Sequence, residues 1–320
     1  LSSQVGGHAG VLSSDDGTLV IKPCLPLEKE FYTALAVDVA ATTTAVDSSE
    51  GGDNLPRTSG PFTYLSPWVP KFYGVLRLEG HVVPNATAPT RPEDVIVDNL
   101  SHPFYRPNVL DIKLGTILYE PNAPPAKRER MLKTARETTS FETGVRLTGF
   151  QVYNGNSGSF TVTPKSFGKT IKASELPVGI ARFFPVRTKE RGEGVRAELL
   201  VRVLEEVLAN LRELVQALER TEIRMIGASV LILWEGDEQV LEAALERTEG
   251  DLVGDESDGS STGGELGGTS SPLRGGPSVV VRLIDFAHTR GAPGEGPDMG
   301  VLQGLQTAIR LVLGRIDQLK

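Results

Sequence analysis

Apolar positions recur with a helical period in two long segments of this chain. Hydrophobic residues return every three or four positions over residues 198–218 and again over residues 300–319, which predicts two amphipathic helices that face the core. A shorter helix is expected over residues 28–35, behind two prolines, with Glu30 directed towards a sheet. Good helix formers predict a further helix over the basic residues 126–136.

Strands are expected where apolar and polar residues alternate, or where a short apolar run is bounded by turn residues. A turn at residues 15–17 leads into the alternating segment 18–22, which predicts a hairpin near the N-terminus. The other predicted strands cover residues 73–78, 94–97, 109–119 as a pair broken at Gly115, 144–153, 228–234 and 278–285. Together with the helices, these strands indicate an α+β fold.

Two segments lack the apolar residues that a core requires. Residues 42–59 are rich in Thr, Ser, Gly and Asp and are predicted to form a surface loop. Residues 249–276 are acidic and rich in Gly and Ser, so they cannot bury enough apolar surface to become ordered. We expect this second segment to be a disordered insertion between the two apolar strands at 228–234 and 278–285.

Composition narrows the classes of function. The 320 residues include 33 Lys and Arg against 41 Asp and Glu, and this net charge of −8 argues against direct nucleic-acid binding. A single cysteine, Cys24, excludes an intramolecular disulfide, and four histidines show no zinc-site spacing, so we expect an intracellular protein. The longest apolar runs fall well short of the ~18 residues that indicate a membrane span.

Two apparent nucleotide or nucleophile motifs fail on their spacing. Residues 168–170 read Gly-Lys-Thr, but Thr163 stands where a phosphate-binding loop requires its first glycine. Residues 155–159 resemble a nucleophile elbow, yet Ser159 replaces the last glycine, so we interpret them as a tight turn.

Three groups of residues carry candidate chemistry. Asp111 and Lys113 share one face of a strand because side chains alternate with period two, and such a pair suits either phosphate chemistry or a structural ion pair. Asp285 ends an apolar strand, as the magnesium-binding acid does in many phosphotransferases. With Lys22 on an N-terminal strand, Asp285 is consistent with a two-lobed ATP site.

A basic helix forms the third group. Several lysines and arginines within a few turns can bind a substrate with multiple phosphates, although a solvated helix face explains such a run equally simply. A second basic cluster lies at Lys165, Lys169 and Lys172. The basic positions of the helix are Lys127, Arg128, Arg130, Lys133 and Arg136.

The order of these motifs resembles that of the inositol polyphosphate kinases. The pattern P-x-x-x-D-x-K-x-G at residues 107–115 is similar to the signature of that family, and I-D-F-A-H-T at residues 284–289 is similar to a second element. Further similarities are S-V-L at residues 229–231, R-F-F at 182–184 and G-P-D-x-G at 296–300. Within the family the chain resembles the multikinase branch of fungi and plants, with the hexakisphosphate kinases next.

The resemblance implies a two-lobed, protein-kinase-like or ATP-grasp-like fold of the α+β class with a small helical substrate-binding insertion. It implies an N-terminal ATP-binding lobe over residues 1–100 and a C-terminal lobe over residues 101–320, with the inositol-phosphate-binding helical segment at 122–140.

The family pattern also implies roles for individual residues. ATP would be bound by Lys22 at its phosphates, by Asp98 and Leu100 at the interlobe hinge, and by Asp111 at the ribose near the reacting hydroxyl. Lys113 would contact the transferred phosphoryl group, Asp285 would hold magnesium, and Ser229 would support that metal. The implied substrate-binding residues are Lys113, Lys127, Arg130, Lys133 (or Thr134 in another alignment), Lys169 and His288.

The implied activity is transfer of the ATP γ-phosphoryl group to hydroxyls of soluble inositol polyphosphates, from the trisphosphate to the tetrakis- and pentakisphosphate. The alternatives are a hexakisphosphate kinase that forms pyrophosphates and a non-catalytic scaffold in a transcription complex, for which residues 249–276 would be the contact segment. Phosphoinositide headgroups and transcription factors are further expected partners. A monomer in the nucleus or cytoplasm is expected, since no heptad run indicates assembly.

Overall fold

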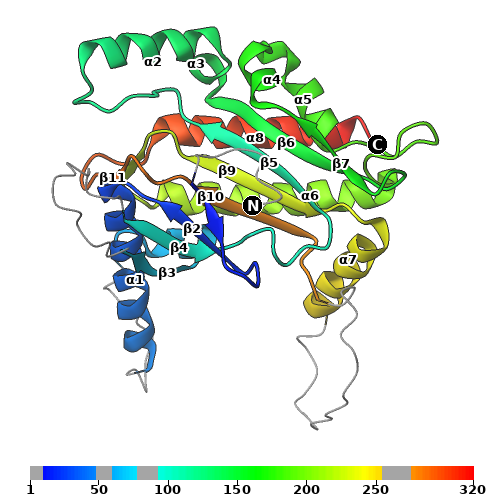
Figure 1. The fold of residues 1–320 in the computed structure, drawn as a ribbon, viewed down its shortest axis with the longest axis horizontal. Coiled ribbons are helices and arrows are strands. Elements are labelled where there is room, and N and C mark those ends of the chain that lie inside the picture. The colour runs from blue at the N-terminus through cyan, green and yellow to red at the C-terminus, as the bar shows by residue number, and fades with distance from the viewer. Residues whose placement is uncertain (1–9, 48–59, 78–92, 254–274) are drawn as a thin grey trace, which may run out of the picture.

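The computed structural model describes residues 10–47, 60–77, 93–253 and 275–320. Two antiparallel sheets dominate these residues, a small one from the first hundred residues and a larger one from the rest (Figure 1). A third pairing, between β8 (Ile223–Met225) and β11 (Thr289–Gly291), lies beside them. The helices and sheets form the α+β fold that the sequence predicts.

The small sheet has the strand order β1-β2-β4-β3. Its strands are β1 (Leu12–Ser13), β2 (Leu19–Pro23), β3 (Phe72–Leu76) and β4 (Asp94–Asp98). The predicted N-terminal hairpin is confirmed, because β1 pairs with β2 across the turn. Helix α1 (Pro26–Asp47) and the short 3₁₀ helix η1 (Thr63–Trp68) pack together next to this sheet.

The large sheet has the strand order β10-β9-β5-β6-β7, and all its neighbours are antiparallel. Its strands are β5 (Pro107–Leu114), β6 (Val145–Asn154), β7 (Ser159–Thr163), β9 (Ser229–Glu235) and β10 (Val279–Ile284). The two apolar runs in the sequence thus become the paired strands β9 and β10, and the turn predicted at residues 155–159 joins β6 to β7.

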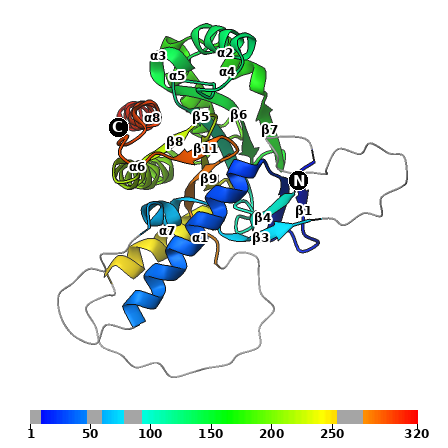
Figure 2. The same cartoon turned by 90° about the vertical axis from the view of Figure 1, so that its left-hand side faces the viewer.

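Two long amphipathic helices, α6 (Ala197–Glu219) and α8 (Met299–Asp317), lie side by side against the large sheet (Figure 2). Both were predicted from their apolar period, and their buried faces supply much of the core. Asp298 starts α8 by accepting hydrogen bonds from the N–H groups of Gly300 and Val301, and it also accepts one from Met225. The G-P-D-x-G motif therefore ties α8 to β8.

The remaining helices are shorter and lie at the edges of the fold. Among the helices of the described residues, none is long and apolar enough to cross a bilayer. These shorter helices are α2 (Pro125–Glu137), α3 (Ser140–Thr143), α4 (Lys165–Thr170), η2 (Ala173–Glu175), α5 (Leu176–Phe183) and α7 (Glu238–Val253).

Two local expectations were wrong. The strand pair predicted over residues 109–119 is the single strand β5, because Gly115 at φ 98° turns the chain out of the sheet and the residues up to α2 form a loop. Glu30 is exposed, whereas Glu28 is buried. Helix α1 starts at Pro26, and two positions on a helix differ by about 200°, so only one of these acids can face the sheet.

The predicted loop and insertion boundaries were also partly wrong. Helix α1 continues to Asp47, so the segment 42–59 begins as helix, and residues 48–59 lie outside the described residues. Helix α7 continues to Val253, which places the first residues of the segment 249–276 in a helix. Residues 254–274, the greater part of that predicted insertion, lie outside the described residues.

Candidate active site

Two lysines from different sheets meet at one carboxylate. Lys22 on β2 places its Nζ 3.4 Å from Oδ1 of Asp285, and Lys113 on β5 places its Nζ 3.7 Å from Oδ2 of the same residue. Asp285 follows directly after β10. Three of the predicted ATP and catalytic residues are therefore assembled at one point between the sheets.

The register of the large sheet holds Lys113 in place. Lys113 pairs with Ser229 across β5 and β9, and its Nζ donates to the carbonyl of Gly227 at 2.7 Å and lies 3.4 Å from Oγ of Ser229. Ser229 is fully buried. Its hydroxyl thus faces the lysine, and its role in supporting a metal remains a prediction.

Glu28 is a further member of this cluster, and no pattern in the sequence indicates it. Its Oε1 lies 2.8 Å from Nζ of Lys22, and its side chain is only 3% exposed. Burial alone would lower the pKa of Lys22, but the charges of Glu28 and Asp285 outweigh it and keep that pKa above its ordinary value. Lys22 is therefore held as a cation between two carboxylates.

Asp285 has an unusual backbone that its neighbour fixes. Its φ is 66°, the only positive value for a non-glycine residue in the described chain, and such a conformation costs a free energy of order ~1–2 kcal/mol. Phe286 is fully buried and stacks on Phe31 of α1 with ring centroids 4.1 Å apart, while Tyr32 meets its edge at 5.5 Å. This aromatic contact anchors the I-D-F segment to α1.

Asp111 lies on the same strand as Lys113 but is enclosed. The residue is 5% exposed, whereas the Asp285 side chain is 32% exposed. Burial raises the pKa of Asp111 above its ordinary value; the charge of Lys113 opposes this rise and that of Asp285 adds to it. Hydrogen-bonding contacts with Ser229 and Thr148 also oppose the rise in this pKa. The contact predicted between Asp111 and a ribose stays a prediction.

An acid that no motif of the sequence indicates joins His288 and Lys127, two predicted substrate ligands. Glu120 lies in the loop between β5 and α2, with Oε1 3.0 Å from Nδ1 of His288 and Oε2 3.8 Å from Nζ of Lys127. The structure thus brings the end of the I-D-F-A-H-T segment close to the start of the basic helix.

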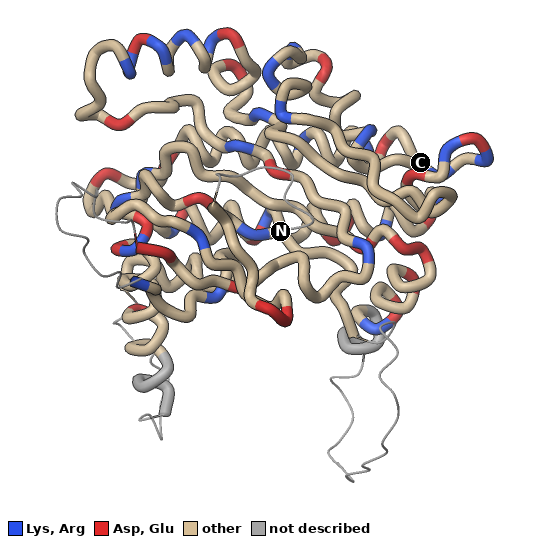
Figure 3. Tube along the Cα trace, in the orientation of Figure 1, with Lys and Arg blue, Asp and Glu red and all other residues tan. Residues whose placement is uncertain are grey.

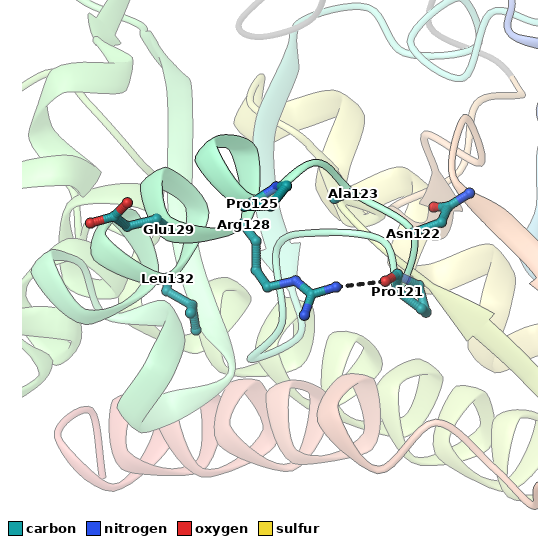
Figure 4. A pocket seen from close by; sticks show the side chains of 7 residues that line it. All are labelled: Pro121, Asn122, Ala123, Pro125, Arg128, Glu129 and Leu132. Carbon is teal, nitrogen blue, oxygen red and sulfur yellow. Dashed lines mark hydrogen bonds between the residues drawn. The ribbon is translucent and has the colours of Figure 1, made fainter.

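The start of α2 is fastened to that same loop. Arg128 donates to the carbonyl of Pro121 at 2.7 Å (Figure 4). Its guanidinium also lies 5.6 Å from the ring centre of Tyr119. Next to this contact is an open pocket of about 400 Å³. The pocket is lined by Pro121, Asn122, Ala123, Pro125, Arg128, Glu129 and Leu132.

The other basic residues of α2 do not converge. Figure 3 shows them along the helix, interrupted by acidic positions. Helical geometry puts Arg130 and Thr134 on the same side of α2 as Lys127, whereas Lys133 lies about 120° away. The side chain of Lys133 is 73% exposed, and its Nζ lies 3.8 Å from Oε1 of Glu137.

Among the described residues, three predicted substrate residues make no direct ion pair or hydrogen bond with the lysine–carboxylate cluster. Lys169 is exposed on α4, and Arg130 is exposed as well. No ion pair or side-chain hydrogen bond in the described part of the chain links Arg130, Lys133 or Lys169 to Asp285 or His288.

The predicted hinge residues lie where the small sheet leads into the large one. Asp98 ends β4, where its backbone N–H donates to the carbonyl of Lys71 at 3.0 Å and its Oδ2 accepts from the N–H of Lys71 at 3.3 Å. Leu100 is partly buried against Phe104 and Leu233. Their adenine-binding role remains a prediction.

The donors near Asp285 suit a cation that shares its ligands with phosphates. In the described residues, no group of three or more His, Cys, Asp or Glu side chains could hold a metal by itself. Magnesium is commonly bound by one or two carboxylates together with substrate phosphates and water. A single accessible carboxylate between two lysines fits that arrangement.

The comparisons with known proteins agree with this geometry. The inositol polyphosphate kinase family profile matches residues 95–313. The chain is 26% identical to the inositol polyphosphate multikinase of Saccharomyces cerevisiae, over 98% of this chain and 97% of that protein. It is 33% identical to inositol hexakisphosphate kinase 2 of Oryctolagus cuniculus, over 68% of this chain but only 50% of that protein.

The fold is also similar to a solved structure. The structure of the multikinase Ipk2 of S. cerevisiae in complex with ADP and Mn²⁺ matches with a TM-score of 0.61 and 23% identity, over 94% of this chain and all of that one. This similarity confirms the predicted fold. Since the family profile covers well over half of the residues, the chain belongs to the inositol polyphosphate kinase family.

Proposed function

We propose that this protein transfers the γ-phosphoryl group of ATP to hydroxyl groups of soluble inositol polyphosphates, as a multikinase. The observation that carries the proposal is the meeting of Lys22 and Lys113 at Asp285, 3.4 and 3.7 Å from its carboxylate oxygens. Membership of the family supports the reaction class, and similarity along 97% of the yeast multikinase supports the branch.

The residues of the cluster suit phosphoryl transfer through charge. The transition state of this reaction is loose and carries negative charge on its equatorial oxygens, so aligned cations do most of the catalysis. Lys22 and Lys113 would neutralise that charge, and the hydrogen bonds from Lys113 to Gly227 and Ser229 fix its position beforehand. Asp285 would hold the magnesium ion, which supplies further positive charge to the ATP phosphates.

A second candidate, a hexakisphosphate kinase that forms pyrophosphates, has its own support. Identity to the hexakisphosphate kinases is higher, at 33% against 26%, although the chain spans only half their length. Both candidates use the same phosphoryl donor and differ in the acceptor. They are therefore separated by the substrate, not by the lysine–carboxylate cluster.

The deciding experiment compares acceptors side by side. Magnesium-dependent ATP consumption is measured with inositol trisphosphate, tetrakisphosphate and hexakisphosphate, and the products are separated by charge. Successive conversion of the trisphosphate to a pentakisphosphate is the expected result. Turnover of the hexakisphosphate alone would favour the second candidate, and absence of turnover on all three would refute the kinase proposal.

The remaining parts of the proposal concern partners. Phosphoinositide headgroups carry the same phosphorylated ring, so vesicles that contain them belong in the same assay. A role as a scaffold for transcription factors would depend on residues 249–276. Deleting this segment is expected to leave kinase turnover intact, because it joins β10 at the Val279 end of the strand, opposite the Ile284 end that leads to Asp285.

A further inference from the structure

The loop before α2 places an acid where a polyanion is expected to bind. Glu120 lies between His288 and Lys127, at 3.0 and 3.8 Å from their nearest nitrogens. Its side chain is 26% exposed, and those of His288 and Lys127 are 34% and 38% exposed, so all three remain accessible to a ligand. A carboxylate at this position opposes the binding of phosphates that both neighbours would attract.

The position of Glu120 is fixed by its surroundings. The N–H of Ala123 donates to the carbonyl of Glu120 at 3.0 Å, so the chain turns directly after it. The guanidinium of Arg128 then ties Pro121 to α2. Since a carboxylate accepts hydrogen bonds but does not donate them, the Nδ1–H of His288 is the donor to Glu120, and Nε2 is left for other partners.

We propose that Glu120 is a specificity-determining residue that limits how many phosphates the acceptor carries. This inference rests on the proposed function and deepens it. The carboxylate neutralises part of the positive charge of Lys127 and occupies Nδ1 of His288, so the site favours acceptors with fewer phosphates. A more highly phosphorylated ring brings an additional dianion close to Glu120 and is discriminated against by repulsion.

The test separates the charge of Glu120 from its hydrogen bond. Glu120→Gln removes the charge but keeps an oxygen that can accept from His288, while Glu120→Ala removes both. Glu142→Gln is the matched control, because Glu142 is exposed on α3, the element after α2, and contributes the same charge change. For each protein, kcat and KM are measured with the tris-, tetrakis- and hexakisphosphate, and hexakisphosphate binding is measured by calorimetry.

In Glu120→Gln we expect hexakisphosphate to bind about tenfold more tightly and the KM for the trisphosphate to fall only about threefold. Glu120→Ala should show the same change in preference with a lower kcat, since His288 loses its partner. The proposal would be overturned if Glu120→Gln changed affinity and KM equally for all acceptors. It would also be overturned if these changes were no larger than those in Glu142→Gln.

Failure of the kinase proposal would give a different result. If the wild-type protein turns over none of the acceptors, the proposed function is refuted, and calorimetry still decides the role of Glu120. Tighter hexakisphosphate binding by Glu120→Gln than by Glu142→Gln would support the charge effect, and equal binding or none would contradict it.

Discussion

The lysine–carboxylate cluster and the basic helix α2 both concentrate charge, but only the cluster is assembled. Three distant parts of the chain supply its members, which share contacts within 4 Å: Lys22 with Glu28, Lys113, and Asp285. On α2, by contrast, Lys133 is paired with Glu137 one turn away. Arg128 and Arg136 lie over aromatic rings, and Lys127 contacts Glu120, the partner of His288.

The difference follows from how each group is positioned. Strand registers and the aromatic anchor of Phe286 impose fixed geometry on the cluster, whereas side chains on an exposed helix find whichever partner is nearest. A charge run in a sequence is therefore weak evidence for a site. A charged residue on a buried strand of defined register is stronger evidence.

The largest effect is expected for Lys113→Met. Loss of a preorganised cation at the transferred phosphoryl group should lower kcat by about 10²- to 10³-fold. The circular dichroism spectrum should be unchanged, since methionine fills a similar volume at a partly exposed position. The rate is measured by ATP consumption with the trisphosphate. Retention of near-normal turnover by a folded variant would place the reaction elsewhere.

Glu28 and Glu30 provide a stability comparison within one helix. Glu28→Ala leaves Lys22 with one carboxylate in a buried place, so we expect a loss of about 3 kcal/mol in the free energy of unfolding. Glu30→Ala changes an exposed side chain, so the free energy of unfolding should change by less than about 0.5 kcal/mol. Urea denaturation of both variants checks this prediction, and equal losses would contradict it.

Variants of Lys127 and Lys133 test whether α2 binds the substrate through one face or through its overall charge. Lys127→Met should raise the KM for the trisphosphate about tenfold, as expected for loss of a charged hydrogen bond. Lys133→Met removes an exposed cation that is already paired with Glu137, so this KM should rise less than about twofold. Similar changes in KM would show that α2 acts by its overall charge.

The smallest effect concerns Asp111 and depends on pH. Because its pKa is raised in the folded protein, the native state holds a proton over a pH range where the unfolded chain has released it. Stability should therefore fall as pH rises from 3.8, the ordinary value, to the raised pKa, and remain lower above it.

Asp111→Asn removes this titration, so the free energy of unfolding of the variant should exceed that of the wild type by about 1 kcal/mol at neutral pH. Thermal unfolding from pH 4 to pH 7 measures the difference between the variant and the wild type. A difference that does not grow with pH would contradict the assignment of the shift to burial of this carboxyl.

Much of the fold could be predicted because periodicity is a local property. The strand that carries Lys113 and the apolar strand before Asp285 follow from residue patterns alone, and so do helices α6 and α8. The second strand expected after Gly115 was wrong, because alternation over a few residues does not specify a partner strand.

The site was predicted less completely because its members depend on tertiary contacts. Glu30 was selected in place of Glu28, since the inward face of a short helix depends on where that helix begins. Glu120 had no signal at all, because it lies in an irregular loop and its partner His288 is 168 positions away. Only the folded chain shows that these acids belong to the site.

The hairpin of β9 and β10 has an evolutionary consequence. Its last paired residues, Trp234 and Val279, are neighbours in the sheet, and Arg247 of α7 donates to the carbonyl of Gly276 at 3.0 Å. The chain therefore leaves and re-enters the body of the protein at nearly the same place. The free-energy cost of closing a connection rises by only about 0.6 kcal/mol for each doubling of its length, so selection can lengthen, shorten or exchange the stretch after α7 while Lys113 stays where the sheet holds it.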